Sequence, residues 1–196
     1  MIRRATYVLS IIVTLICFTE AFASGASDLQ WGMSKASVVA IMGEGKSNLD
    51  QVVSAENETL SYYGQTISKF DGAVLSLFFI NDQLYSKQFS LKESAGRLKY
   101  NYLLNALKDK YGNEGNNIIL LQKYLSSLSG SEVDETTANL LVKLKQVKIA
   151  TWTSKDTDIL LSWVAGKNKN DYGMTMIVYS PAGELLPEVD YKNDDL

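Results

Sequence analysis

Histidine is absent from this chain, and its 196 residues include a single cysteine, Cys17. Without histidine the chain lacks the usual general base of serine and cysteine hydrolases and the commonest ligand of transition metals. One cysteine cannot close a disulfide within the chain, and zinc–thiolate sites need several. We therefore expect no catalytic residue, no cofactor and no metal site, and we do not expect an enzyme.

Arginine is also scarce, since Arg97 is the only one beyond residue 23. The whole chain has a formal net charge of −3 at pH 7. Proteins that bind nucleic acids need a strongly basic face. This composition therefore excludes nucleic acid from the expected partners.

The first 23 residues have the three parts of a secretory signal peptide. Two arginines precede an apolar run over residues 7–18, and Ala21-Phe22-Ala23 supplies the small-x-small cleavage pattern. A run of about a dozen residues is too short for a bilayer, which needs roughly 20. We predict that residues 1–23, which contain Cys17, are removed, and that the mature chain is periplasmic or secreted without a transmembrane segment.

The mature chain divides into a folded part and a tail. Residues 24–183 have the length and apolar content of one domain. Residues 184–196 contain five acidic residues and one lysine, with few apolar side chains. Such a segment buries too little surface to offset the entropy of ordering its backbone, so we predict an acidic, mobile tail.

Local patterns predict alternating helices and strands. Ser34 suits a helix N-cap, Met33 can pack against Val38, and Gly43 suits a stop, which predicts a helix over residues 35–42. Further helices are expected over 94–111, 118–128 and 136–146, and strands over 60–68, 73–80, 84–91, 147–153, 158–165 and 173–180. The prediction is an α+β fold, with an antiparallel sheet of about five to six strands and helices packed on one face. The order suggests a helix-then-three-strands pseudo-repeat.

Three motifs that could carry chemistry have simpler explanations. Gly45-Lys46-Ser47 matches a loose phosphate-binding loop, but a helix precedes it where a buried strand is required, so we interpret it as a helix stop and a solvated turn. Ser34 has no histidine to activate it and is expected to cap its helix. Asp156 and Asp158 could form a carboxylate pair, although two acids at a turn are more often only solvated.

The segment from Trp31-Gly32-Met33-Ser34 to Met42-Gly43, followed by a hairpin, resembles exported bacterial domains of the SmpA/OmlA type. That group, to which β-lactamase-inhibitor-like modules are similar, shares a Gly-Met-[Ser/Thr]-x-x-x-Val…Gly helix on an antiparallel sheet. The resemblance covers residues 29–91. It implies a non-enzymatic module for protein binding or envelope assembly and supplies no catalytic residues.

Aromatic side chains are the remaining candidates for a binding surface. Trp31, Trp152, Trp163 and Tyr172 lie on or beside predicted strands, and aromatics that are exposed together mark interaction sites. The leading hypothesis is a non-catalytic module that binds another envelope protein, with no oligomeric state implied. The alternative is a periplasmic small-ligand or glycan-binding protein, or a histidine-free carboxylate hydrolase. A deep pocket with two acids near a tryptophan would favour the alternative, and a flat or grooved sheet face with exposed aromatics would favour the first.

Overall fold

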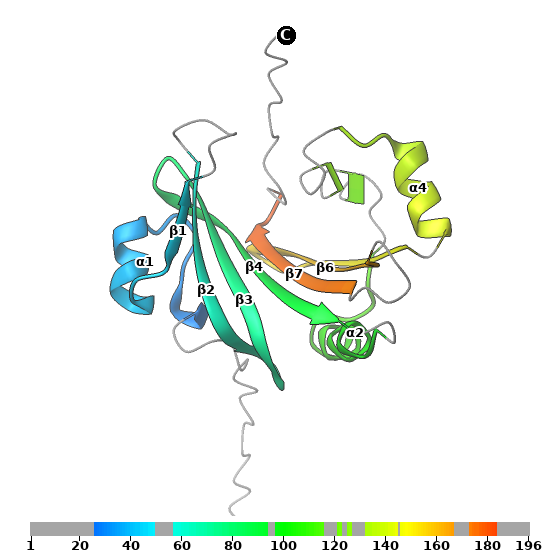
Figure 1. Ribbon diagram of the computed structural model, residues 1–196, viewed down its shortest axis with the longest axis horizontal. Coiled ribbons are helices and arrows are strands. Elements are labelled where there is room, and N and C mark those ends of the chain that lie inside the picture. Colours follow the sequence, from blue (N-terminus) through cyan, green and yellow to red (C-terminus); the bar gives the residue numbers. More distant parts are fainter. Residues whose placement is uncertain are drawn as a thin grey trace, which may run out of the picture.

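An antiparallel sheet of seven strands carries most of the described chain, in the order β1-β2-β3-β4-β7-β6-β5 (Figure 1). The computed structural model describes residues 26–49, 57–93, 97–115, 121–122, 125–126, 132–144, 146–166 and 173–183. The strands are β1 (Lys46–Leu49), β2 (Asn57–Ile67), β3 (Phe70–Ile80), β4 (Gln83–Glu93), β5 (Val147–Thr153), β6 (Thr157–Val164) and β7 (Gly173–Pro181). The helices are α1 (Lys35–Met42), α2 (Leu98–Tyr111) and α4 (Glu135–Lys143), after a 3-10 turn at Ala26–Asp28. The predicted α+β fold with an antiparallel sheet is confirmed.

Strand β1 is the element that raises the number of strands above the expected five to six. It begins at Lys46, inside the segment that we interpreted as a solvated turn, and Lys46 lies opposite Ser61 of β2. Its four residues are too few and too polar for a recognisable alternation. Pairing with β2, the next strand along the chain, makes this segment a strand.

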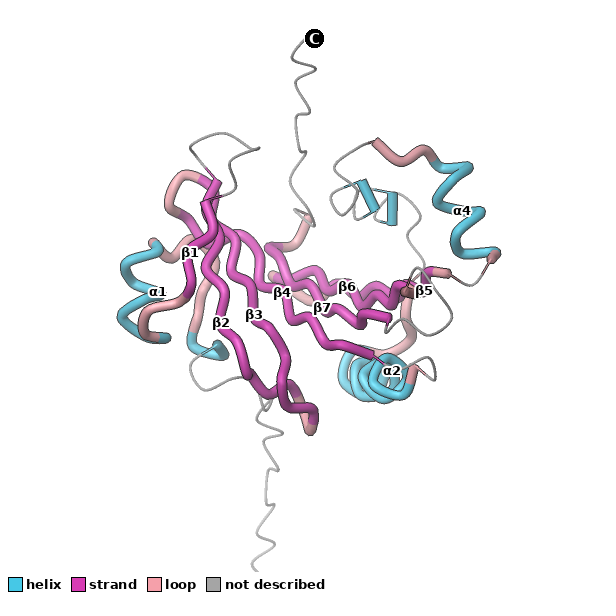
Figure 2. The backbone as a smooth tube through the Cα atoms, in the orientation of Figure 1, coloured by secondary structure: helices cyan, strands magenta, loops and turns pink. Residues whose placement is uncertain are grey.

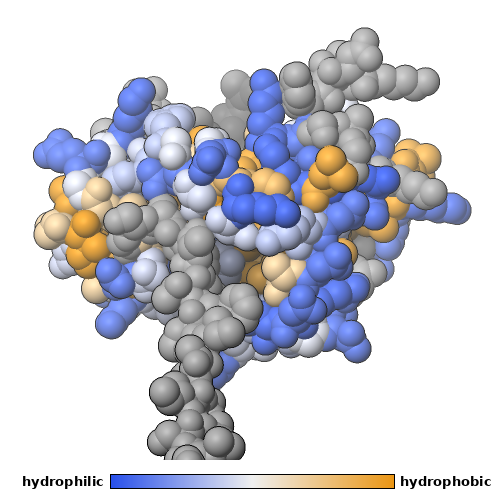
Figure 3. Space-filling view, turned by 90° about the horizontal axis from the view of Figure 1, so that it is seen from below, coloured by the Kyte–Doolittle hydropathy of each residue, from blue (hydrophilic) through white to orange (hydrophobic). Residues whose placement is uncertain are grey.

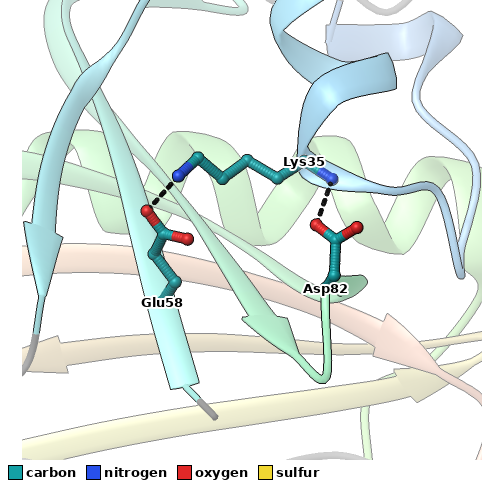
Figure 4. A network of polar contacts seen from close by, with 3 residues as sticks. All are labelled: Lys35, Glu58 and Asp82. Carbon is teal, nitrogen blue, oxygen red and sulfur yellow. Dashed lines mark hydrogen bonds and ion pairs between the residues drawn. The ribbon is translucent and has the colours of Figure 1, made fainter. Parts of the chain in front are cut away.

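Helix α1 begins and ends where its capping residues predict. The Ser34 hydroxyl accepts a hydrogen bond from the Ser37 N–H at 3.2 Å, and Gly43 ends the helix with φ of 78°. The β3–β4 turn has positive φ at Asn81 and Asp82, 49° and 60°, as a two-residue hairpin requires. Asp82 also accepts a hydrogen bond from the backbone N–H of Lys35 at 3.0 Å, while the Lys35 ammonium pairs with Glu58 of β2 (Figure 4). Two carboxylates therefore fix the start of α1 against the sheet.

The two faces of the sheet carry separate hydrophobic clusters. One cluster contains alternate residues of β3, such as Leu75 and Leu77, with Ile177 of β7 and buried residues of α1 and α2. The other contains Leu160 of β6 and Val178 of β7, together with residues of α4. The sheet is strongly twisted, because β2 and β3 run close to vertical in Figure 2 while β6 and β7 run close to horizontal.

The helices therefore lie on both faces, where we expected them on one. Strands β6 and β7 are apolar at consecutive positions, as at Ile159, Leu160 and Leu161, so each needs a cover on both sides. Figure 1 shows α2 below these strands and α4 above them. In the described chain four strands follow α1 and three follow α4, so the order agrees only in part with the expected pseudo-repeat.

Several predicted segments lie outside the described residues. They are the signal peptide, the acidic tail and Tyr172, and parts of the helices predicted over 94–111 and 118–128. Residues 121–122 and 125–126 are helical, as predicted. Among the helices described, none is long and apolar enough to cross a membrane.

Candidate binding surface

Half of one sheet face has no described helix over it. On the side opposite α1 and α2, the positions of β2, β3 and β4 form what we call the open half-face, which consists of Thr59, Ser61, Val74, Ser76, Phe78, Ile80, Tyr85, Ser86, Gln88 and Ser90. Of these, Val74, Phe78, Ile80 and Tyr85 are only partly buried and belong to neither hydrophobic cluster. On the same face the strands β5, β6 and β7 are covered by the cluster that includes α4.

A polar row crosses the open half-face from strand to strand. Ser61, Ser76 and Gln88 lie directly opposite one another on β2, β3 and β4. The hydroxyl oxygens of Ser61 and Ser76 are 3.4 Å apart, and the Gln88 amide donates to Ser90 at 3.2 Å. Ser61 is only 6% exposed, so Ser76 and Gln88 are the members of this row that a partner can reach.

An aromatic pair lies next to the polar row. Ser86 pairs with Phe78, so the preceding residue, Tyr85, is the extra residue of a β-bulge. The Phe78 and Tyr85 rings are 6.3 Å apart and tilted by 53°. Burial raises the pKa of Tyr85 to about 12, so its phenol stays protonated and can donate a hydrogen bond.

Positively charged residues lie on the half of this sheet face that β1 to β4 form. Its strand positions include Lys46 and Lys92, and no aspartate or glutamate occupies a described position there. The Lys46 ammonium lies 5.1 Å from the centre of the Tyr63 ring, and 57% of Tyr63 is exposed. The surface therefore favours a partner that presents acidic groups.

A shallow pocket of about 230 Å³ lies at the end of the sheet where the β3–β4 turn and the end of β7 meet. It is lined by Gly32, Ile80, Asn81, Gln83, Leu84, Tyr85 and Pro181. Among the described residues of its lining there is no carboxylate and no tryptophan. The pocket shares Ile80 and Tyr85 with the open half-face and therefore continues it.

Three of the four aromatic residues proposed from the sequence lie on the face that α1 and α2 cover. Trp152 and Trp163 are only 5% and 6% exposed, and the Trp152 indole donates to the Gly112 carbonyl at 2.9 Å. Trp31 is partly buried and donates to the Thr157 hydroxyl at 3.2 Å. Trp152 and Trp163 thus offer little surface to a partner, and a role for Tyr172 stays a prediction.

Sequence reasoning missed Lys87, which lies on the core-facing side of β4. It is directly opposite Leu77 of β3 and Tyr179 of β7. Its ammonium donates to the Leu29 carbonyl at 2.7 Å and lies 4.6 Å from the centre of the Trp31 ring. Burial lowers the pKa of Lys87 to about 8, and Asp156 opposes this shift. The sequence signal was its position, since Lys87 alternates in step with the buried Phe89 and Leu91.

The candidate carboxylate pair is divided between two structural roles. Asp158 is 8% exposed and accepts hydrogen bonds from the Thr153 hydroxyl and the Gly183 N–H, both at 2.7 Å. Asp156 is exposed and accepts from the Thr157 hydroxyl at 3.2 Å. One oxygen of Asp158 thus binds the end of β5, and the other binds the backbone just after β7. Across the described ranges, no three acidic side chains gather closely enough to hold a metal ion.

Exposed apolar side chains also occur away from the open half-face. On α4, Leu140 and Leu144 are 51% and 56% exposed, and Ile41 of α1 is 40% exposed. Figure 3 shows hydrophobic residues in several separate groups, among them one at the left end, where α1 lies, and one at the right end, where α4 lies. Small separate groups of this kind are normal on a soluble protein.

Comparison of the chain with protein-family models, curated proteins and solved structures finds no match.

Proposed function

We propose that this protein is an exported, non-catalytic module that binds another envelope protein on the open half-face. The observation that carries the proposal is the row of Val74, Phe78 and Ile80, which are only partly buried, belong to neither cluster and have no described helix over them. Uncovered apolar side chains on a sheet are typical of interaction surfaces. The polar row across the strands adds hydrogen-bonding groups, which give such a surface specificity.

Three further considerations support this proposal. Lys46 adds positive charge on the exposed edge strand beside Tyr63, which suits a partner with acidic groups. The signal-peptide pattern of residues 1–23 directs the chain to the envelope. The resemblance of residues 29–91 to SmpA/OmlA-type domains implies the same class of function.

The small-ligand and hydrolase alternative has less support. It calls for two acids near a tryptophan in a deep pocket, whereas the pocket beside Tyr85 is shallow and lined by neither. The buried acid Asp158 is fully engaged in hydrogen bonds. A carboxylate that acts in catalysis needs an oxygen free to reach a substrate.

A bulky substitution on the open half-face tests the proposal. Ser76→Trp fills the polar row without entering either cluster, and Asp109→Trp adds the same bulk on the exposed side of α2. We expect Ser76→Trp to lower the recovery of a specific partner from envelope extract by at least about tenfold, which is roughly 1.4 kcal/mol of binding free energy. Asp109→Trp should keep wild-type recovery, and circular dichroism should show both variants folded. Equal recovery with both variants, or equal loss, would contradict the proposal.

A further inference from the structure

The N-terminal end of α2 carries the most exposed large apolar side chain of the described residues. Leu98, the first residue of the helix, is 72% exposed, and Tyr102, one turn later, is 38% exposed. Helix α2 packs on the sheet through the buried side chains of Tyr100, Leu103 and Leu107. Because residues four positions apart share one side of a helix, Leu98 and Tyr102 both point away from the sheet.

Basic residues surround this exposed side of α2. Arg97 and Lys99 flank Leu98 in the chain. The turn between β2 and β3 adds Lys69, whose ammonium lies 3.7 Å from the centre of the Tyr102 ring. None of the ion pairs within the described ranges involves these three cations. In that part of the chain, no carboxylate in direct contact neutralises their charge.

Contacts between α2 and the β2–β3 turn hold these side chains together in what we call the α2 tip, which consists of Lys69, Phe70, Arg97, Leu98, Lys99 and Tyr102. The rings of Phe70 and Tyr102 are 5.3 Å apart in a T-shaped arrangement. The Lys99 ammonium donates to a backbone carbonyl of β4, which keeps its charge beside the start of the helix. Two acids lie close by along the chain: Asp71 accepts a hydrogen bond from a hydroxyl of β2, and Asp109 lies about two turns beyond Tyr102. The tip therefore has a net positive charge around an exposed leucine.

We propose that the α2 tip docks on an anionic lipid surface, with Leu98 inserted among the headgroups. Leucine and aromatic side chains are stabilised at the bilayer interface, and lysine and arginine are attracted to anionic headgroups. A specific protein interface usually buries more than about 1,000 Å² of complementary surface. The tip instead presents one protruding leucine within a ring of positive charge. A bilayer needs no complementary shape, so these observations favour lipid over an acidic protein.

Docking through the α2 tip leaves the open half-face accessible. Helix α2 and the open half-face lie on opposite sides of the sheet, and Figure 1 shows α2 below the strands. A molecule docked through Leu98 therefore presents the open half-face away from the lipid. The inference goes beyond the proposed function and does not depend on it.

Sedimentation with lipid vesicles tests the proposal. The processed chain, residues 24–196, is mixed with vesicles of phosphatidylcholine alone or of phosphatidylcholine and phosphatidylglycerol in equal amounts. Leu98→Gln removes the inserted side chain, and Lys99→Gln removes one charge. Leu140→Gln and Lys143→Gln make the same two changes on α4, where both side chains are exposed. Circular dichroism should show that all four variants are folded, because none of these side chains is buried.

We expect the protein to bind the mixed vesicles and not phosphatidylcholine alone, and the bound fraction to fall with added salt. Leu98→Gln and Lys99→Gln should each weaken binding by at least about fivefold, because each removes a favourable contact with the interface. The two α4 variants should bind like the wild type.

Three results would overturn the proposal. The first is failure to bind the mixed vesicles, or equal binding to both vesicle types. The second is equal weakening by the α4 variants, because the effect would then not belong to the α2 tip. The third is capture of an acidic protein that requires Leu98 while vesicles do not bind, because the tip would then be a protein interface.

Discussion

The two halves of the sheet differ in how many of their faces are covered. In β6 and β7 apolar residues occur at consecutive positions and are buried on both sides, as Leu160 and Leu161 are at 0% exposure. In β3 the exposure alternates, with Leu75 and Leu77 buried and Val74 and Phe78 only partly so. The apolar side chains of β6 and β7 are buried on both faces of the sheet. The apolar side chains on one face of β3 are only partly buried and belong to neither hydrophobic cluster. That difference locates the candidate binding surface.

The largest effect should come from the covered half. Leu160→Ala removes a fully buried side chain of β6 from the hydrophobic cluster that includes α4. We expect the free energy of unfolding to fall by about 2–5 kcal/mol, because the change leaves a cavity as well as losing apolar burial. Urea denaturation followed by circular dichroism measures the difference. A loss below about 1 kcal/mol would mean that this half is no better packed than the open one.

The matching change in the open half should cost much less. Phe78→Ala removes a partly exposed ring that lies beside the ring of Tyr85. We expect a loss of about 1–2 kcal/mol in the same denaturation experiment, below the 3–5 kcal/mol typical of a buried phenylalanine. If the loss equals or exceeds that of Leu160→Ala, the open half-face is part of the core and the comparison fails.

The N-cap of α1 tests how much this helix, which packs on the opposite face of the sheet, contributes to stability. Ser34→Ala removes the hydroxyl that accepts the Ser37 N–H. The free energy of unfolding should fall by about 1 kcal/mol, the usual value for an N-cap. Partner recovery should remain at the wild-type level, because Ser34 lies outside the open half-face. Complete loss of function in a folded Ser34→Ala protein would instead indicate a direct chemical role for this serine.

The smallest effect is expected from the tail. Truncation after Pro187 removes most of the acidic residues predicted to form a mobile segment. Its composition predicts almost no change in the thermal midpoint, because the segment buries too little apolar surface to order its backbone. Differential scanning calorimetry of the two chain lengths checks this. A fall of several degrees would show that the tail packs on the domain and that the predicted boundary at residue 183 is wrong.

Sequence patterns predicted the elements whose causes are local. Ser34 and Gly43 determine where α1 begins and ends. Those signals act within a few residues, so they can be read without knowing the fold. The placement of α4 on the second face depends on β6 and β7, and the formation of β1 depends on β2. Both depend on contacts with another element of the fold, which local patterns do not reveal.

The candidate surface was only partly predictable for the same reason. The sequence directed attention to tryptophans, but Trp152 and Trp163 pack beneath α2, and aromatic character does not reveal which face a strand presents. Strand β3 did offer an indication of this surface, because it has apolar residues on both of its faces. Val74 and Phe78 on one face alternate with buried leucines on the other. Without the sheet order, nothing distinguished a strand covered on both faces from a strand with one face open.

Site-specific photo-cross-linking tests the central claim most directly. Benzoylphenylalanine at Ser76 places a reactive group in the polar row of the open half-face, and the same residue at Asp109 places it on the exposed side of α2. We predict one discrete protein adduct from position 76 in intact cells and none from position 109. No adduct from position 76, or the same adduct from both positions, would contradict the assignment of the open half-face as the binding surface.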